Sequence, residues 1–376
     1  MARIELSGVT KKFKKTVALK NIDLVIEDKE FLVLFGPAGA GKTTMLKIIA
    51  GVEMPDEGLV KMDGEIVNLV EASERNIAMV FENYALYPHM TVYDNIAFPL
   101  RSKLYRESED EIKARIHRVT KVMHIDMLLE RLPAQLSNGQ KQRVALGRSL
   151  VRNPNIFLMD EPLAHLDAKL RHAMRAELKE MQHVFNTTTL YVTHDYMEAL
   201  SLGDRIAIID NGELIQIGTG KEIYNLPVNE FVARLVGEPE INLLPVNFSY
   251  SRGQIEADIL NSKIVLPEGI QKETLLKQRP VQADIGIRAQ HIQYFFEPGE
   301  GRLKGSVYSF EPIGNKANLL VDVEGTQIRT TASNDLNVKL NADIWITFNM
   351  EKVLYFDSEK KHLLTCAFQE KAGTED

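Results

Sequence analysis

The fold of this chain is decided by one segment, Gly36-Pro37-Ala38-Gly39-Ala40-Gly41-Lys42-Thr43. It matches the pattern G-x-x-x-x-G-K-[ST] and separates a predicted strand from a predicted helix. The strand is the apolar run Phe31–Phe35, whose lack of alternation is typical of a strand buried on both faces. The helix opens at Thr43 and Thr44 and closes at Gly51. In this setting the glycine-rich turn predicts a loop that binds phosphate.

Each residue type in this loop suits a phosphate ligand. The glycines let the backbone curl, so that successive N–H groups point at phosphate oxygens. The helix N-terminus adds its positive end. Lys42 brings a full positive charge to the β- and γ-phosphates, and the hydroxyl of Thr43 is a ligand for Mg²⁺. The loop therefore predicts binding of ATP or GTP.

A second motif spans residues 156–161, where four apolar residues are followed by Asp160 and Glu161. A carboxylate at the end of a strand beside the phosphate loop can hold Mg²⁺ through water. The adjacent Glu161 can then orient and polarise an attacking water molecule. Taken alone, the motif is also consistent with a strand that ends in a surface turn at Glu161-Pro162.

Similar apolar runs recur along the N-terminal part of the chain, and helix-length segments separate the last three. They lie at 77–81, 156–159, 190–192 and 206–209. Asp167 is a good N-cap for the helix that follows it, in which Leu170, Met174, Leu178 and Met181 form one apolar stripe. Strands that alternate with helices predict an α/β fold with a mostly parallel sheet, covered on both faces.

Two parts of the chain depart from this alternation. A helical insertion, about 84–152, is predicted from the apolar side formed by Ile112, Ile116, Val119 and Met123. Short β-rich runs and turn residues replace helix patterns after about residue 240. These runs lie at 285–287, 307–310, 318–323 and 344–348, with turns at Gly314 and Gly325. We expect a nucleotide-binding domain over 1–237 and an all-β second domain over 238–376.

Composition and charge exclude several classes of protein. The chain has 376 residues, 44% hydrophobic and 26% charged, which is ordinary for a globular protein of two or three domains. Its net charge of −7 argues against a nucleic-acid partner, because binding a phosphate backbone needs a basic excess. Cys366 is the only cysteine, so no intramolecular disulfide can form. Without a membrane-length apolar stretch or an apolar signal core, we expect a soluble chain of a reducing compartment.

One segment selects among nucleotide enzymes that share the first two motifs, namely Leu136-Ser137-Asn138-Gly139-Gln140. With this segment the sequence resembles the ATP-binding cassette (ABC) family, whose signature reads L-S-G-G-Q. The supporting motifs follow in the family's order. They are Tyr84-Ala85-Leu86-Tyr87-Pro88 after a strand, Leu166-Asp167 after Glu161, and His194 after 190–193. The resemblance implies the P-loop ABC fold and an ATPase.

The resemblance also implies a head-to-tail dimer, in which two cassettes enclose two ATP molecules. Each ATP would lie between the phosphate loop of one chain and the signature segment of the other. In the signature, Ser137 and the N–H groups of Gly139 and Gln140 would form a second helix N-terminus that faces the γ-phosphate.

The family pattern assigns roles to individual residues of this chain. It makes Glu161 the general base, brings His194 to the γ-phosphate and gives Asp167 a part in coupling the two sites. Phe13 occupies the position of an aromatic that stacks on adenine, although it also reads as a core residue of an edge strand. The residues implied to bind nucleotide are Phe13, Gly36, Pro37, Ala38, Gly39, Ala40, Gly41, Lys42, Thr43, Thr44, Glu82, Ser137, Asn138, Gly139, Gln140, Asp160 and Asp167. The residues implied to hold Mg²⁺ are Thr43, Glu82 and Asp160.

Two positions depart from the family pattern. Glu82 replaces a glutamine, which adds negative charge beside a polyphosphate and should sharpen the dependence of ATP binding on Mg²⁺. Asn138 replaces a signature glycine and brings a side chain close to phosphate, where its amide can also donate a hydrogen bond. These changes leave two hypotheses open, a functional variant homodimer or a heterodimer with a second, non-identical ABC ATPase.

Within the family, the chain resembles sugar-importer ATPases related to the maltose system. The similarity lies in residues 229–237, in Asn242-Leu243-Leu244-Pro245 and in Gly286-Ile287-Arg288-Ala289-Gln290-His291. The last stretch is similar to G-I-R-P-E-H of that group's oligosaccharide-binding-fold (TOBE-type) regulatory domain, although Ala289 and Gln290 depart from it. The second domain is thus a regulatory module, or else a dimerisation and spacer module.

This resemblance implies an ATPase that energises an importer of a carbohydrate, a sugar derivative or glycerol phosphate. The chain would lie peripherally on the cytoplasmic face of the plasma (inner) membrane. Its partners would be two transmembrane permease subunits and, through them, a solute-binding protein. Alternatives are an importer of another small solute, such as a polyamine or an inorganic ion, or a regulatory cassette that forms half of a heterodimer. Cassettes that act on ribosomes or DNA usually contain two cassettes or a long coiled coil, and neither is visible here.

Overall fold

The described residues form two compact units, Met1–Gly220 and Lys221–Asp376. The computed structural model describes residues 2–81, 84–102, 107–164 and 166–366. Helix α7 (Gly220–Asn225) begins at the last residue of the first unit, and its other residues and α8 (Glu230–Leu235) belong to the second. The sequence analysis placed the boundary between the two domains at 237/238, whereas the compact units divide at 220/221. The domain boundary stays a prediction, because a boundary between family domains need not coincide with one between compact units.

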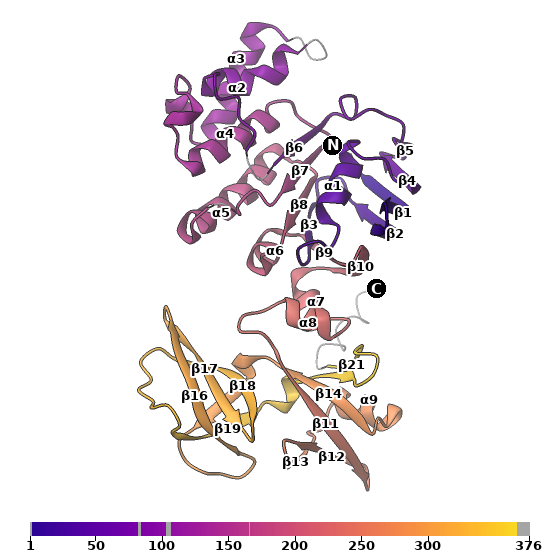
Figure 1. The fold of residues 1–376 in the computed structure, drawn as a ribbon, viewed down its shortest axis with the longest axis vertical. Coiled ribbons are helices and arrows are strands. Elements are labelled where there is room, and N and C mark those ends of the chain that lie inside the picture. The colour runs from indigo at the N-terminus through magenta and orange to yellow at the C-terminus, as the bar shows by residue number, and fades with distance from the viewer. Residues whose placement is uncertain (1, 82–83, 103–106, 165, 367–376) are drawn as a thin grey trace. The chain divides into compact units, whose positions relative to one another are not determined.

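A six-stranded sheet forms the centre of the first unit (Figure 1). In spatial order its strands are β10 (Glu213–Gly218), β9 (Arg205–Asp210), β3 (Phe31–Phe35), β8 (Thr189–Thr193), β7 (Ile156–Asp160) and β6 (Ile77–Val80). All neighbouring strands run parallel except β9 and β10, which form an antiparallel hairpin. The predicted mostly parallel sheet is therefore confirmed.

A second sheet in this unit is antiparallel and was not predicted from the sequence. In spatial order its strands are β2 (Thr16–Ile26), β1 (Ile4–Phe13), β4 (Glu57–Met62) and β5 (Glu65–Ile66). Helix α1 (Lys42–Ala50) shares one hydrophobic core with both sheets, through residues such as Met45, Leu46 and Ile49. Gly51, at φ 76°, ends this helix as expected.

The opposite face of the central sheet is covered by α5 (Ala168–Phe185) and α6 (Tyr196–Leu202). Met174, Leu178 and Met181, three of the four residues of the predicted stripe, are buried. The predicted helical insertion is also confirmed, between β6 and β7. Its elements are α2 (Val92–Ala97), η1 (Phe98–Arg101), α3 (Glu109–Val122), η2 (Asp126–Leu128), η3 (Pro133–Gln135) and α4 (Asn138–Leu150).

The second unit contains two antiparallel sheets packed around one main core. One sheet has the order β13 (Ser262–Val265), β12 (Gln254–Ile259), β11 (Asn242–Ser251), β14 (Gln282–Ile287), β20 (Leu354–Asp357) and β21 (Leu363–Thr365). The other has the order β15 (Ile292–Phe295), β19 (Asp343–Phe348), β16 (Leu303–Ile313), β17 (Lys316–Val323) and β18 (Thr326–Ser333). All four predicted β runs fall within these strands.

Helical turns interrupt the β structure of the second unit. They are α9 (Ile270–Gln278), η4 (Ala289–His291) and η5 (Met350–Lys352). Helix α9 is an α-helix within the region that the sequence analysis expected to be all-β. Gly314 and Gly325 have φ values of 62° and 84°, as their predicted turn positions require.

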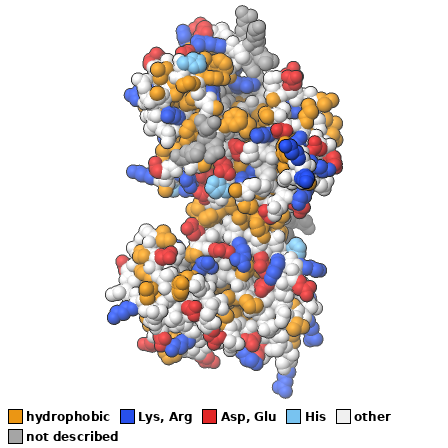
Figure 2. All heavy atoms as spheres, viewed as in Figure 1, with side chains coloured by type: hydrophobic (Ala, Val, Ile, Leu, Met, Phe, Trp, Pro, Cys, Tyr) orange, Lys and Arg blue, Asp and Glu red, His pale blue; other side chains and the backbone are white. Residues whose placement is uncertain are grey.

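Charged groups of both signs are interspersed on the face shown in Figure 2. In the part of the chain that the structure describes, no helix is long and apolar enough to cross a membrane.

Arg288 of the GIRAQH stretch is a buried clamp within the second unit. Its guanidinium donates to the carbonyl oxygens of Val236 (2.6 Å) and Tyr224 (2.6 Å), and it lies 3.6 Å from the centroid of the Tyr224 ring. Burial lowers the pKa of this guanidinium. The arginine therefore joins η4 to the segment around α7 and α8. These contacts give Arg288 a structural role within the second unit.

Arg288→Met should lower the free energy of unfolding of the second unit by about 2–4 kcal/mol, because it leaves two buried carbonyl groups without their donor. Trp345, the only tryptophan, lies in β19 and reports unfolding of this unit by fluorescence during denaturation of the full chain. Lys339→Met, at an exposed position, is the control and should change stability by less than about 0.5 kcal/mol. Equal stability of the two variants would contradict the clamp.

Candidate functional site

The phosphate loop leaves β3 at the carboxyl edge of the central sheet and enters α1. Gly36 must be glycine, because a Cβ there would lie 2.1 Å from the carbonyl oxygen of Ile209 in β9. Gly41 adopts a φ of 108°, and its Cβ would lie 2.5 Å from the carbonyl oxygen of Ala18. The two glycines thus let the loop pass close to neighbouring backbone, which holds it at the sheet edge.

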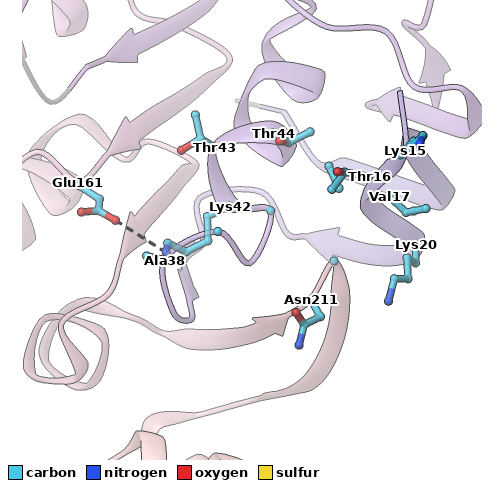
Figure 3. Close-up of a pocket in the computed structure, with 14 residues that line it drawn as sticks. Lys15, Thr16, Val17, Lys20, Ala38, Lys42, Thr43, Thr44, Glu161 and Asn211 are labelled. Carbon is cyan, nitrogen blue, oxygen red and sulfur yellow. Dashed lines mark ion pairs between the residues drawn. The ribbon is translucent and has the colours of Figure 1, made fainter. Parts of the chain in front are cut away.

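Lys42 lies at the centre of this loop, with only 5% of its surface exposed. Its Nζ donates hydrogen bonds to the carbonyl oxygens of Gly36 (2.9 Å) and Pro37 (2.9 Å), and it lies 3.8 Å from Oε1 of Glu161 (Figure 3). Burial lowers the pKa of Lys42, while the charges of Glu161 and Asp160 act against that shift. The loop therefore holds a desolvated positive charge, suited to an anionic ligand.

Asp160 and Glu161 follow at the end of β7, as predicted. The Thr43 hydroxyl donates to Oδ1 of Asp160 at 3.3 Å, so two oxygen ligands of the kind that Mg²⁺ prefers lie side by side. Glu161 has a φ of 45°, outside the strand conformation. Its Oε2 lies 2.7 Å from Nδ1 of His194, which follows β8 directly. The structure thus brings together the four residues that the sequence placed in three separate motifs.

A cavity of about 690 Å³ opens beside this cluster. Its lining includes Ala38, Gly39, Gly41, Lys42, Thr43, Thr44 and Glu161 of the predicted site. Two turns that the sequence analysis missed complete it, as Figure 3 shows. They supply Lys15, Thr16, Val17, Ala18 and Lys20 from the start of β2, and Asn211 and Gly212 from the β9–β10 hairpin. The run Lys11-Lys12-Phe13-Lys14-Lys15 is the sequence feature that could have indicated the first of these turns, because it places positive charge next to Phe13.

Among the described residues, several that the sequence predicted are not part of the cavity lining. Phe13 ends β1, is 41% exposed, and lies under the ammonium group of Lys11, 5.2 Å from the ring centroid. That exposure argues against the core interpretation of Phe13. Asp167 caps α5 by accepting the N–H of Leu170. Glu82 lies outside the described residues. Pro37 and Ala40 lie in the phosphate loop, where the N–H of Ala40 donates to the carbonyl oxygen of Pro37.

The signature segment forms the N-terminus of α4 in the helical insertion, away from the cavity of its own chain. Ser137 and Gln140 form a capping box: the Ser137 oxygen accepts the Gln140 N–H at 3.3 Å, and the Gln140 side chain accepts the Ser137 N–H at 3.0 Å. The Gln140 N–H, expected to face phosphate, is therefore already used inside the helix cap. The hydroxyl hydrogen of Ser137 is still able to donate, since its oxygen acts here as the acceptor.

Positions 138 and 139, both glycine in the L-S-G-G-Q signature, differ in their surroundings. Asn138 is exposed, so its side chain fits without strain in the single chain. Gly139 is buried, and a Cβ there would lie 2.7 Å from Cδ2 of Leu170 in α5. A side chain at position 139 would therefore displace the Leu170 side chain, whereas the single chain accommodates a side chain at position 138.

Comparison with known proteins identifies the family. A family model described as "ABC transporter" matches residues 19–164. The trehalose/maltose import ATP-binding protein MalK of Thermococcus litoralis is 40% identical over 95% of this chain and 98% of its own length. The sn-glycerol-3-phosphate import ATP-binding protein UgpC 1 of Rhizobium johnstonii is 38% identical over 99% of each chain. The chain belongs to the ABC transporter family.

A solved ABC structure agrees with this assignment. It is the dimeric, post-hydrolysis state of the ATP-binding cassette MJ0796, bound to ADP and Pi. That cassette is 35% identical to this chain, with a TM-score of 0.52, and the match covers 58% of this chain and 98% of the other. The chain is therefore an ABC ATPase, and the cavity beside Lys42 stays the predicted nucleotide site.

Gly36→Ala should weaken ATP binding by about 100-fold, because its Cβ cannot fit against the Ile209 carbonyl group without displacing the loop. Gly64→Ala, in the turn between β4 and β5 and outside the site, is the matched control. Its φ is 85° but nothing lies within 4 Å of the added Cβ, so backbone strain of about 1 kcal/mol should lower stability alone and leave ATP binding within about twofold of wild type. Titration with a fluorescent ATP analogue measures both. Equal losses would show that the close approach at Gly36 is not what shapes the site.

Proposed function

We propose that this chain binds and hydrolyses ATP to energise an importer of a carbohydrate, a sugar derivative or glycerol phosphate. The observation that carries the proposal is the position of Glu161, whose carboxylate lies between Lys42 of the phosphate loop (3.8 Å) and His194 (2.7 Å). The relatives support the class of cargo. Besides MalK and UgpC, the xylose/arabinose import ATP-binding protein XacK of Haloferax volcanii is 40% identical over 96% of this chain.

In the proposed reaction, Lys42 binds the β- and γ-phosphates and Glu161 activates the attacking water. Binding of phosphate would give the Lys42 ammonium a stronger partner than the two carbonyl groups it now contacts. His194 would contact the γ-phosphate with the ring nitrogen that does not face Glu161. Its Nδ1 bond to Glu161 thus orients the imidazole and holds the base in place.

Thr43 and Asp160 fit a Mg²⁺ ion that accompanies the nucleotide. Their oxygen atoms are 3.3 Å apart at the mouth of the loop, and both are hard ligands. When bound, the ion would neutralise charge on the phosphate oxygens. Glu82 is proposed as a further ligand from its place in the family pattern.

Because Ser137 and Asn138 do not line the cavity of their own chain, we propose that a second cassette supplies them across a head-to-tail dimer. The exposed Phe13 ring would then stack on adenine. The second cassette is a further copy of this chain or a related ABC ATPase.

Two transmembrane permease subunits are the proposed partners of this dimer. A second cavity, of about 360 Å³, lies between β6 and the helical insertion, lined by residues that include Tyr87, Phe98 and Arg148. Arg148 donates to the carbonyl oxygens of Ala85 (2.7 Å) and Tyr84 (3.2 Å), which positions the segment expected to receive a short coupling helix. A solute-binding protein would deliver the cargo, and the ATPase would lie at the cytoplasmic face of the membrane.

Glu161→Gln should abolish phosphate release and trap a dimer loaded with ATP, because the amide cannot accept the proton of the attacking water. Gel filtration with ATP and Mg²⁺ measures the dimer, and a phosphate assay measures the rate. Glu180→Gln, an exposed carboxylate on α5, is the control and should behave as wild type. A monomeric Glu161→Gln variant together with a silent wild-type chain would contradict the ATPase proposal.

Isolation of this chain from membranes of its own organism should recover two polytopic membrane proteins in equal amount. Mass spectrometry identifies them, and their cargo in uptake assays decides between carbohydrate, glycerol phosphate and another small solute. Recovery with ribosomes or DNA, and without membrane proteins, would contradict the importer proposal. Recovery of a second ABC ATPase in equal amount would show a heterodimer.

A further inference from the structure

Arg171 connects the segment that follows Glu161 with the segment that follows His194. It lies in α5, one turn after the Asp167 cap. Its Nη2 donates to the carbonyl oxygen of Leu166 at 3.2 Å, and its Nη1 lies 3.3 Å from Oδ2 of Asp195. One guanidinium group thus holds the residue before Asp167 and the residue after His194 at the same time.

The contact with Asp195 fixes the backbone that carries His194. Oδ1 of Asp195 accepts the N–H groups of Met197 (2.8 Å) and Glu198 (3.3 Å), while its own N–H donates to the Thr193 hydroxyl oxygen at 3.0 Å. That hydroxyl donates in turn to Oε2 of Glu198 at 2.7 Å. Both neighbours of His194 are therefore held by hydrogen bonds, and the imidazole is the exposed member of the segment.

Glu198 anchors this network inside the protein. It is 3% exposed, and its Oε2 accepts hydrogen bonds from Thr193 and from the hydroxyl of Tyr191 (2.9 Å). Its other oxygen lies 4.0 Å from Nε of Arg171. The arginine is thereby a positive group that faces two carboxylates, Asp195 and Glu198, next to His194.

The contact with Leu166 fixes the other segment. Leu166 is buried, whereas the adjacent Asp167 is exposed and caps α5 by accepting the N–H of Leu170 at 2.9 Å. A shift of Asp167 would move the Leu166 carbonyl group and pull on Arg171. Only arginine can serve both ends, because its planar fork directs separate N–H groups at a carbonyl and a carboxylate, whereas a lysine ammonium is a single point.

We propose that Arg171 is a positioning residue that couples the placement of Asp167 to that of His194. A partner cassette that contacts Asp167 would then set the position of His194, and through it the carboxylate of Glu161, in the same chain. The inference rests on the proposed ATPase dimer and adds to it the route by which contact at one segment reaches the catalytic pair.

The test compares Arg171→Met with wild type in the full-length chain, each with Asp167 intact and with Asp167→Ala. With Asp167 intact, Arg171→Met should lower kcat about tenfold, the size of a modest coupling between sites. Its affinity for a fluorescent ATP analogue should stay within about twofold of wild type, because Arg171 does not line the nucleotide cavity. With Asp167→Ala, the further loss from Arg171→Met should shrink to less than about twofold.

Two further variants separate coupling from simple loss of stability. Lys179→Met removes another ion pair of α5, to Asp204 at 2.9 Å, without touching either segment, and should keep the wild-type kcat. Arg171→Lys keeps the charge but not the fork, so its kcat should fall between those of wild type and Arg171→Met while it melts near the wild-type temperature. It also serves as the test if Arg171→Met does not fold.

The outcomes are distinct. A wild-type kcat in Arg171→Met, or an equal loss in both Asp167 backgrounds, overturns the coupling and leaves the ATPase assignment in place. A loss matched by Lys179→Met overturns it too, because that result would reflect packing of α5. Hydrolysis by wild type in the same assay reports on the proposed function, and a silent wild type overturns both.

Discussion

The site depends on a single buried cation, the ammonium group of Lys42. Desolvation makes this charge costly, and the structure offsets the cost with two loop carbonyl groups and the nearby carboxylate of Glu161. A polyphosphate can replace these partners of the ammonium group. The positive charge that it needs is already buried in the loop. The loop is therefore prepared for an anion before one arrives, and the surrounding glycines are what allow its backbone to close around Lys42.

The parallel sheet brings the remaining chemistry to this cation. Strands β3, β7 and β8 are neighbours, and parallel strands end at the same edge, so the residues that follow each of them meet there. Thr43, Glu161 and His194 are far apart in the sequence and become one cluster for this reason. The carboxyl edge thus carries the residues of the site, while the signature segment lies on a separate helical insertion, away from the cavity of its own chain.

Sequence patterns predicted the elements whose signal is local. Five of the six strands of the central sheet, all but β10, are apolar runs without alternation. Asp167 and Gly51 mark helix ends by their own chemistry. The antiparallel sheet of β1, β2, β4 and β5 was missed because its strands mix exposed and buried positions and contain bulges, which weaken the period-two pattern. Helix α9 was missed for a similar reason, since it lacks a clear apolar stripe within a β-rich region.

The sequence by itself determined the family and the class of ligand and predicted the residues that would meet that ligand, because Gly36–Thr43, Asp160-Glu161 and the signature each pair a residue type with a chemical need. Only the tertiary structure decided what those residues do to one another. The contact between Glu161 and His194, the lysines that complete the cavity, and the structural roles of Arg171 and Arg288 all join segments distant along the chain. Such contacts cannot be predicted from the periodicity of a sequence, because strand order and helix packing determine which distant residues meet.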